Sequence, residues 1–269
     1  MERMKEVKTA LITGGSRGIG KGIALVLASE GYDTAITYSS NKEMAEEVAH
    51  MIKTKYGRKC FIFKAQMERE KTPCTLVKAV IEKMGKIDVL VNNAGARYDA
   101  KIFDVDNEKM NYFINLDFKS YIMMMKEVSR HMINNKIKGN IINITSTRGR
   151  RAYPANSIYC AVKAALAIAT ESAALDLAPY GIRANCVAPG AIRNSDNEVS
   201  KRFYEGLAPR IPIGRVGTTE DIGNAVAWLV SDKAAYIIGA TLTVDGGLIL
   251  PGMPERVIGD NNTGWGIPK

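Results

Sequence analysis

Tyr159 and Lys163 stand four residues apart in a stretch with helical periodicity, from about Ser157 to Ala178. This spacing places both side chains on one face of a helix, about one turn apart. A tyrosine with an ordinary pKa of about 10 is a poor acid or base at neutral pH. A nearby ammonium group stabilises the phenolate and lowers that pKa toward the working range. The pair therefore predicts a proton donor and acceptor, although such pairs also occur on solvated helices.

Ser146 is the second indication of chemistry. It lies thirteen residues before Tyr159, directly after the expected strand Asn140–Thr145. Open α/β sheets bind their ligands at the carboxyl ends of parallel strands. We therefore expect the Ser146 hydroxyl to lie in the same site as the tyrosine and the lysine.

A glycine-rich segment, Thr13-Gly-Gly-Ser-Arg-Gly-Ile-Gly20, joins the first expected strand to the first expected helix. Glycines allow a tight turn and a close approach of the backbone to a pyrophosphate, and a helix N-terminus offers free N–H groups. The segment predicts a dinucleotide site whose contacts come from Gly14, Ser16, Arg17, Gly18, Ile19 and Gly20.

The end of the second expected strand, Thr34–Tyr38, bears on the choice between NAD and NADP. An NAD binder usually has an acidic residue about 20 residues after the glycines, where it holds the ribose 2′-hydroxyl. Here Ser39 and Ser40 follow the strand, and the first acid is Glu43. A 2′-phosphate would meet no carboxylate there, and Arg17 offers it a cation. The sequence thus favours NADP(H), with NAD(H) as the other possibility, and contacts from Tyr38, Ser39 and Ser40.

Short apolar runs alternate with longer amphipathic stretches along the chain. Strands are expected at Thr9–Thr13, Thr34–Tyr38, Cys60–Lys64, Val89–Asn92, Asn140–Thr145, Ala184–Ala188 and Thr241–Val244. Helices are expected at Ile19–Ser29, Lys42–Tyr56, Thr75–Met84 and Ser157–Ala178, among others. This alternation predicts right-handed βαβ crossovers. The fold class is therefore α/β, a doubly wound three-layer Rossmann fold whose parallel sheet of about seven strands carries helices on both faces. Residues 1–250 form one domain and residues 251–269 a C-terminal extension.

The composition bears on partners and location. The chain has 269 residues, 46% of them hydrophobic, and a net charge of +9. The basic residues are spread along the chain and no nucleic-acid-binding signature is present, so we expect no nucleic-acid partner. No uninterrupted apolar run reaches the roughly 18 residues of a membrane span, and the first strand begins too early for a signal peptide, so we expect a cytoplasmic protein without a membrane partner. Four scattered cysteines and two histidines predict no metal site.

Five motifs together carry a family resemblance. They are the glycine-rich segment, Asn92-Asn-Ala-Gly95, Ser146, Tyr159-x-x-x-Lys163 and Pro189-Gly190. Their order resembles that of the short-chain dehydrogenases/reductases over nearly the whole chain, from Thr9 to Gly247. The resemblance implies a nicotinamide-dependent oxidoreductase that acts on an alcohol/carbonyl pair.

The resemblance also implies roles for the catalytic residues. Tyr159 would give a proton to the carbonyl oxygen during reduction and accept it during oxidation. Lys163 would tune Tyr159 and hydrogen-bond the nicotinamide ribose, and Ser146 would orient the substrate oxygen. Asn115 matches the asparagine that holds a water for proton relay in this family.

Further cofactor contacts follow from the same resemblance. Asn93, Ala94 and Gly95 would line the adenosine ribose, and Pro189, Gly190 and Ile192 the nicotinamide. Two positions depart from the family pattern: Gln66, followed by Met67, replaces an aspartate that contacts the adenine, and Asn194 replaces a threonine near the carboxamide. The family is also commonly homotetrameric, and the alanines of the helix Ala161–Ala178 suit close helix contact across an interface.

The sequence leaves several substrate classes as candidates. Arg97, Arg148, Arg150, Arg151 and Arg193 surround the expected mouth, which would favour an anionic carbonyl or alcohol, unless these side chains only face solvent. The segment Asn194–Pro212 corresponds to the variable lid. The candidates are a 3-oxoacyl-thioester reductase, a glucose or other sugar 1-dehydrogenase, a hydroxysteroid dehydrogenase, and a silent dinucleotide-binding sensor that turns over no substrate.

Overall fold

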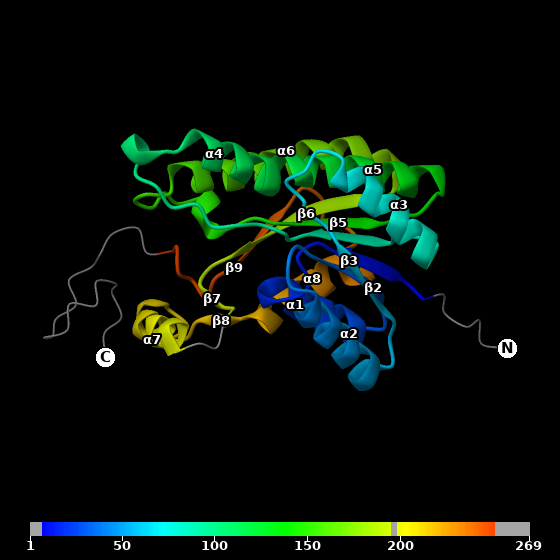
Figure 1. Cartoon of the computed structure of the whole chain (residues 1–269), viewed down its shortest axis with the longest axis horizontal. Helices are drawn as coiled ribbons and strands as arrows, with labels where there is room; N and C mark the ends of the chain where they lie inside the picture. The colour runs from blue at the N-terminus through cyan, green and yellow to red at the C-terminus, as the bar shows by residue number, and fades with distance from the viewer. Residues whose placement is uncertain (1–6, 195–197, 251–269) are drawn as a thin grey trace, which may run out of the picture.

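A seven-stranded parallel sheet forms the centre of the molecule. The computed structural model describes residues 7–194 and 198–250, and the extension expected at 251–269 lies outside these residues. The sheet has the order β3-β2-β1-β4-β5-β6-β9 (Figure 1). Its strands are β1 (Thr9–Ile12), β2 (Asp33–Tyr38), β3 (Cys60–Lys64), β4 (Val89–Asn92), β5 (Asn140–Ile144), β6 (Arg183–Pro189) and β9 (Thr241–Val244). The order reverses direction between β1 and β4, which is the topological switch point where such sheets bind ligands.

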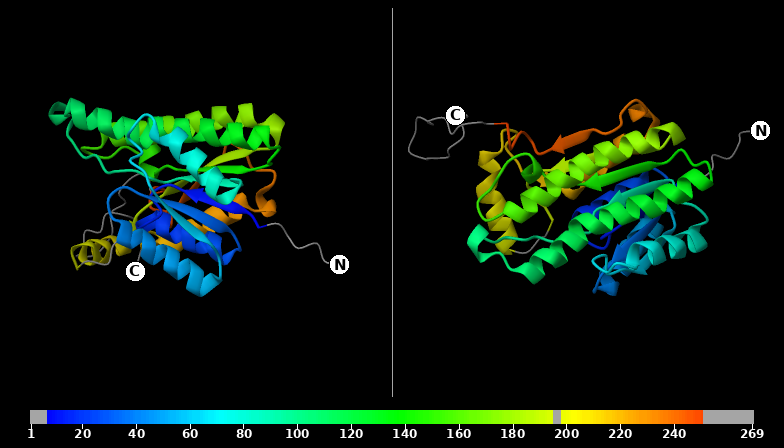
Figure 2. Two further views of the ribbon diagram at one scale, coloured as in Figure 1. Left: turned by 45° about the vertical axis from the view of Figure 1, so that its right-hand side comes forward. Right: turned by 90° about the horizontal axis from the view of Figure 1, so that it is seen from above.

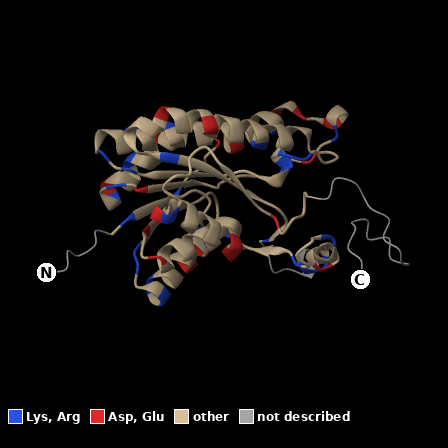
Figure 3. Ribbon diagram, turned by 180° about the vertical axis from the view of Figure 1, so that it is seen from behind, with Lys and Arg blue, Asp and Glu red and all other residues tan. Residues whose placement is uncertain are grey.

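Helices cover both faces of the sheet, so the predicted three-layer fold is confirmed. One layer contains α1 (Gly18–Ser29), α2 (Lys42–Tyr56) and α8 (Thr219–Val230), and the other contains α3 (Thr72–Met84), α4 (Asn107–Ile114), α5 (Ser120–Asn134) and α6 (Ser157–Leu177) (Figures 1 and 2). Basic and acidic residues are interspersed over both layers (Figure 3).

Short elements complete the described chain. They are η1 (Ile102–Asp104), the π-helical segment η2 (Asn115–Lys119), η3 (Thr147–Gly149), η4 (Ala178–Tyr180), β7 (Ile192–Arg193), α7 (Glu198–Leu207), η5 (Ala208–Arg210), β8 (Gly217–Thr218) and η6 (Asp232–Ala234). In Figure 1, α7, β7 and β8 lie at the edge of the sheet where the parallel strands end.

The core has two halves, one on each face of the sheet. Alternate residues of a strand point to opposite faces, so Ile12 packs with α1 and α8 while its neighbour Leu11 packs with α3 and α5. Burial on both faces explains why the central strands read as nearly continuous apolar runs.

The element boundaries follow the sequence closely. Strands β3, β4 and β9 have the expected bounds, but α3 begins at Thr72 rather than Thr75. Pro73 stands in the first turn of that helix, where the missing N–H group has no intrahelical partner to lose.

Helix α6 is long and apolar. By length and composition alone, the segment Ser157–Tyr180 could cross a membrane, with a mean hydropathy of 1.4 over its best window, although Lys163, Glu171 and Asp176 interrupt it. In the fold it packs against β6, and six of its residues are buried. A helix that packs its apolar face against a sheet meets the same criterion of length and hydropathy, because the residues of that face are apolar.

Candidate active site

Lys163 is the centre of the site. Its side chain is buried, and Nζ donates a hydrogen bond of 3.3 Å to the carbonyl oxygen of Ile144, the last residue of β5. The same Nζ lies 5.8 Å from the centre of the Tyr159 ring. The structure thus brings the phenol and the ammonium together at the carboxyl end of β5.

Ser146 stands at the start of η3, which packs closely against α6. It is the N-cap residue of η3, and its Oγ accepts a hydrogen bond of 3.2 Å from the backbone N–H of Arg148. A Cβ atom on Gly149 would lie 3.0 Å from the backbone nitrogen of Ala164. The glycine therefore allows η3 to lie directly against the turn of α6 that carries Lys163.

Asn115 begins the π-helical segment between α4 and α5. Its carbonyl oxygen accepts the N–H of Ser120, a bond one residue longer than the usual α-helical one. Such bulges in helices are frequent at functional sites. Two residues later, the buried Asp117 places Oδ1 2.9 Å from Lys163 Nζ. Sequence reasoning missed Asp117, and the signal available was an acid two residues after Asn115, between the apolar residues Leu116 and Phe118.

The surroundings of Lys163 favour its charged form. Burial lowers the pKa of the lysine, but the oxygens of Tyr121, Asp117 and Tyr159 outweigh that effect and raise its pKa above the ordinary value. The Tyr121 ring lies 5.2 Å from Nζ, and burial raises the pKa of its hydroxyl. The site therefore presents a protonated ammonium and a neutral Tyr121 at neutral pH.

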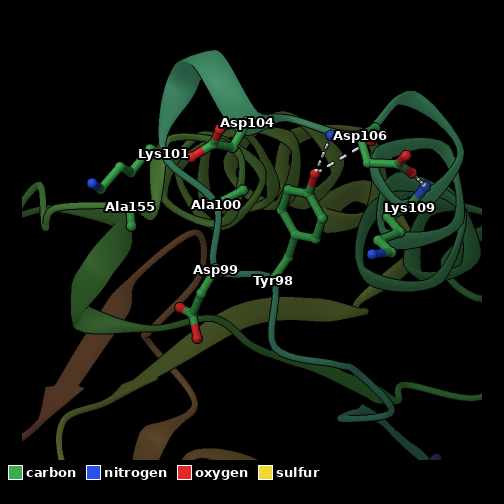
Figure 4. A pocket seen from close by; sticks show the side chains of 8 residues that line it. All are labelled: Tyr98, Asp99, Ala100, Lys101, Asp104, Asp106, Lys109 and Ala155. Carbon is green, nitrogen blue, oxygen red and sulfur yellow. Dashed lines mark hydrogen bonds between the residues drawn. The ribbon is translucent and has the colours of Figure 1, made fainter.

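An aromatic row extends from the site. The Tyr159 ring lies 5.8 Å from that of Phe113, which lies 5.8 Å from that of Tyr98. The backbone N–H of Asp106 donates a hydrogen bond of 3.1 Å to the Tyr98 hydroxyl. A pocket of about 340 Å³ opens beside this row (Figure 4), and its lining consists of Tyr98, Asp99, Ala100, Lys101, Asp104, Asp106, Lys109 and Ala155.

The glycine-rich loop is held by a side chain on β2 and by one that directly follows β4. Gly14 N–H donates to Thr37 Oγ1 at 2.9 Å, and the Asn93 amide donates to the carbonyl oxygens of Thr13 and Gly14. Gly14 has a φ of +65°, and a Cβ there would lie 2.9 Å from Ala94 Cα. The loop can therefore take its shape only with glycine at this position.

The N-terminus of α1 has the properties of a phosphate site. Its N-cap side chain, Arg17, makes no capping hydrogen bond and the described first turn holds no acid. The first N–H groups of the helix thus have no partner within it, and the helix dipole favours an anion there. Gly18 has a φ of +53°, and a Cβ added there would lie 3.5 Å from Asn194 Cβ and would otherwise face open space. These residues fit the pyrophosphate of a dinucleotide.

The end of β2 lies beside this loop. Arg17, Ser39 and Ser40 are exposed, and Tyr38 is half-buried. The Asn41 side chain accepts the N–H of Met44 and caps α2. The two serine hydroxyls and the guanidinium are thus available to a ligand.

The other predicted cofactor residues have varied surroundings. Gln66 is half-buried, whereas the side chains of Met67, Pro189 and Ile192 are buried. A Cβ on Gly95 would lie 2.6 Å from Asp117 Oδ1, and one on Gly190 would lie 2.5 Å from Asp245 Cβ. Asn194 Oδ1 accepts a hydrogen bond of 3.3 Å from the Tyr204 hydroxyl. At Met67 and Ile192, any contact with a cofactor would come from the backbone.

The arginines near the mouth are partly neutralised within the protein. Arg97 pairs with Asp99, and Arg148 lies 3.9 Å from the same carboxylate while it donates to Asn156 and covers the Tyr153 ring. Arg150 donates to Thr243 Oγ1 at 3.2 Å. Ala155, next to Asn156, has a φ of 57°, which lies in the left-handed region that residues other than glycine seldom adopt.

Comparisons with known proteins match most of the chain. The family model described as enoyl-(acyl carrier protein) reductase matches residues 14–249. The 3-oxoacyl-[acyl-carrier-protein] reductase FabG of Staphylococcus aureus is 39% identical over 248 residues, which are 92% of this chain and 100% of that protein. Glucose 1-dehydrogenase 2 of Bacillus subtilis is 35% identical over 90% of this chain and 95% of its own.

Solved structures show the same fold over the same length. Acetoin dehydrogenase YohF from Salmonella typhimurium has a TM-score of 0.84 and 35% identity, covering 91% of this chain and 98% of its own. A short-chain dehydrogenase/reductase from Serratia marcescens has a TM-score of 0.83 and 34% identity, covering 90% and 97%. With the motifs, the sheet order and the length all in agreement, the chain belongs to the short-chain dehydrogenase/reductase family, oxidoreductases that interconvert alcohols and carbonyl compounds.

Proposed function

We propose that this enzyme uses NADPH to reduce a ketone to a secondary alcohol, and that the ketone is a 3-oxoacyl thioester. The observation that carries the proposal is the position of Lys163, which lies between the carboxyl end of β5 and the Tyr159 ring. The bound nicotinamide would supply the hydride, and the protein contributes position and electrostatics.

The residues of the chain divide the remaining work. The Ser146 hydroxyl donates a hydrogen bond to the substrate oxygen and stabilises the negative charge that develops there. Tyr159 transfers its phenolic proton to the same oxygen, and the Lys163 ammonium stabilises the phenolate that remains. The Asn115 segment holds the water through which the proton is replaced.

The cofactor preference rests on the end of β2. Arg17, Ser39 and Ser40 are exposed there, and Ser39-Ser40-Asn41-Lys42 contains no carboxylate. A 2′-phosphate would find a cation and hydroxyl donors and no repelling charge. These residues support NADPH as the preferred cofactor.

Two substrate classes have separate support. A thioester substrate is supported by the similarity to the 3-oxoacyl-[acyl-carrier-protein] reductase of Staphylococcus aureus, which is matched over its whole length. A small uncharged hydroxyketone or sugar is supported by Asp99, which offsets the charge of Arg97 and Arg148 at the mouth. Acetoin and glucose are the substrates that the names of two similar proteins suggest.

We also propose a cytoplasmic homotetramer. Ile168 and Leu175 are 64% and 72% exposed. Because they stand seven residues apart on α6, they share its outer face, which a second copy could cover. The four cysteines form no disulfide, which suits a reducing compartment. Light scattering on the purified chain would give the number of subunits.

A cofactor titration followed by a substrate panel tests the proposal. NADPH and NADH are titrated against the protein by nicotinamide fluorescence. Acetoacetyl and crotonyl thioesters, acetoin, a diketone and a keto-steroid are then added with NADPH, and glucose with NADP⁺. Tight NADPH binding with turnover of the acetoacetyl thioester is expected. Turnover of acetoin or glucose alone would assign the enzyme to small uncharged hydroxyketones or sugars. Binding of NADPH without turnover of any substrate would favour a silent sensor.

A further inference from the structure

The ammonium of Lys163 has a carboxylate partner inside the protein. Asp117 Oδ1 lies 2.9 Å from Lys163 Nζ, and the two side chains are 1% and 5% exposed. A charged pair at such depth is held at a large desolvation cost, and removal of one partner leaves the other charge buried without compensation. The pair is therefore a feature of the site itself and not a surface ion pair.

The carboxylate is fixed by its second oxygen. Asp117 Oδ2 accepts a hydrogen bond of 2.9 Å from the backbone N–H of Ala96. The carboxylate also fills the space in front of Gly95, where a Cβ would come within 2.6 Å of Oδ1. Asp117 thus joins the loop after β4, which holds the cofactor motif, to the lysine on α6.

The π-helical segment explains how Asp117 reaches this position. It is the third residue of Asn115–Lys119, and it is buried together with Leu116. The extra residue in a π-helical turn shifts the side chains that follow relative to an unbroken α-helix. Asn115 and Asp117 are therefore placed by one local distortion.

We propose that Asp117 is a positioning residue that holds Lys163 in place and offsets its positive charge, and thereby raises the pH at which Tyr159 loses its proton. The inference rests on the proposed roles of Tyr159 and Lys163. In this role Asp117 sets the pH range over which Tyr159 can donate a proton.

The groups that face Lys163 come from four elements. They are Asp117 from η2, Tyr121 from α5, Tyr159 from α6 itself and Cys186 from β6. Burial raises the pKa of Tyr121, and it raises that of Cys186 to about 11, so both are neutral at neutral pH. Among the described groups around the lysine, Asp117 is thus the one that supplies a negative charge.

Asp117→Asn removes that charge and keeps the shape. The amide oxygen can still accept the Ala96 N–H, so the loop keeps its hydrogen bond. Lys163 then acts on Tyr159 with an uncompensated charge. Because the ammonium lies 5.8 Å from the centre of the Tyr159 ring and favours the phenolate, we expect the Tyr159 midpoint to fall in the variant.

The test follows the tyrosinate absorbance of the whole protein against pH. The Tyr159 signal is the difference between each protein and the same protein with Tyr159→Phe. A downward shift in Asp117→Asn is expected, and an unchanged or higher midpoint would overturn the inference. Should Asp117→Asn fail to fold, the smaller Asp117→Ser is measured by the same criterion.

A matched control tests whether the effect depends on where the carboxylate is removed. Asp88 precedes β4 at the opposite end of the strand, and its Oδ2 accepts the N–H of Thr9 at 2.7 Å. Asp88→Asn makes the same chemical change and should leave the Tyr159 midpoint at the wild-type value.

Turnover is measured separately on any substrate that the panel reveals. A shifted titration without turnover of any substrate would reject the proposed reaction and support the role of Asp117. Normal turnover of a substrate, together with an unshifted Tyr159 midpoint and an unshifted pH–rate profile, would support the proposed reaction and reject the role of Asp117.

Discussion

Asn143 on β5 donates a hydrogen bond of 2.8 Å from Nδ2 to Oγ1 of Thr170 on α6. Asn143 Oδ1 in turn accepts a hydrogen bond of 2.9 Å from Asn92 Nδ2, at the end of β4. All three side chains are buried. This polar chain crosses from the sheet to the helix that carries Tyr159 and Lys163, and it fixes the position of that helix over the strands.

Thr170→Val is expected to destabilise the fold. The variant keeps the shape of the side chain but removes the oxygen that accepts from Asn143, whose Nδ2 then keeps the weaker Met125 Sδ acceptor at 3.2 Å. A buried hydrogen bond lost in this way costs about 1–3 kcal/mol. Urea unfolding followed by circular dichroism measures the loss. Ser129→Ala, which removes an exposed hydroxyl bonded to Lys126, is the control and should have little effect. Equal stability of Thr170→Val and wild type would show that the hydrogen bond contributes nothing net.

Tyr159→Phe is expected to abolish most turnover and leave the affinity for NADPH nearly unchanged. The substitution removes only the proton donor, whose contribution is about 10²–10⁴-fold in rate. Steady-state kinetics and fluorescence titration measure the two quantities. Tyr180→Phe, which alters an exposed tyrosine on η4, serves as the control. Wild-type turnover by Tyr159→Phe would refute the assignment.

Arg17→Ala is expected to weaken NADPH binding and to change NADH binding much less. A charged hydrogen bond is worth about 1.5–3 kcal/mol, so the Kd for NADPH should rise by about 10- to 100-fold. Fluorescence titration with both nucleotides measures the ratio. Lys42→Ala, a nearby cation that pairs with Glu46 on α2, is the matched control. An equal loss for both cofactors would mean that Arg17 does not distinguish them.

Asp221→Asn is expected to lower stability at neutral pH by about 1 kcal/mol, since Asp221 completes the capping box of α8. The hydrogen bonds from Arg215 lower the pKa of this carboxyl to about 2. A lowered pKa in the folded state contributes stability above the unfolded pKa, about 4, and loses it as the pH falls through the folded value.

The difference between wild type and Asp221→Asn should therefore stay constant down to weakly acidic pH and shrink toward pH 2. Urea unfolding at a series of pH values measures it. A difference that grows on acidification would contradict the sign. Glu220→Gln, on the neighbouring position of the same first turn, serves as the control.

The sequence by itself determined the fold and the family, and it predicted the main site residues. The strand bounds at Val89–Asn92 followed from a local apolar run, because a strand that is buried on both faces is nearly continuously apolar. Tyr159 and Lys163 followed from helical spacing, and the glycine-rich loop from its place between the first strand and the first helix. Each of these patterns lies within a short stretch of the chain, so it can be recognised without knowledge of the tertiary contacts.

What only the tertiary structure decided depends on residues far apart in the chain. Asp117 reaches Lys163 across 46 positions because the π-helical turn η2 faces an early turn of α6. Asp99 offsets Arg148 from a different loop, which changes the charge that a substrate would meet. Spacing along the chain carries no signal for such pairs, since their energies arise only when packing brings the charges together and excludes water.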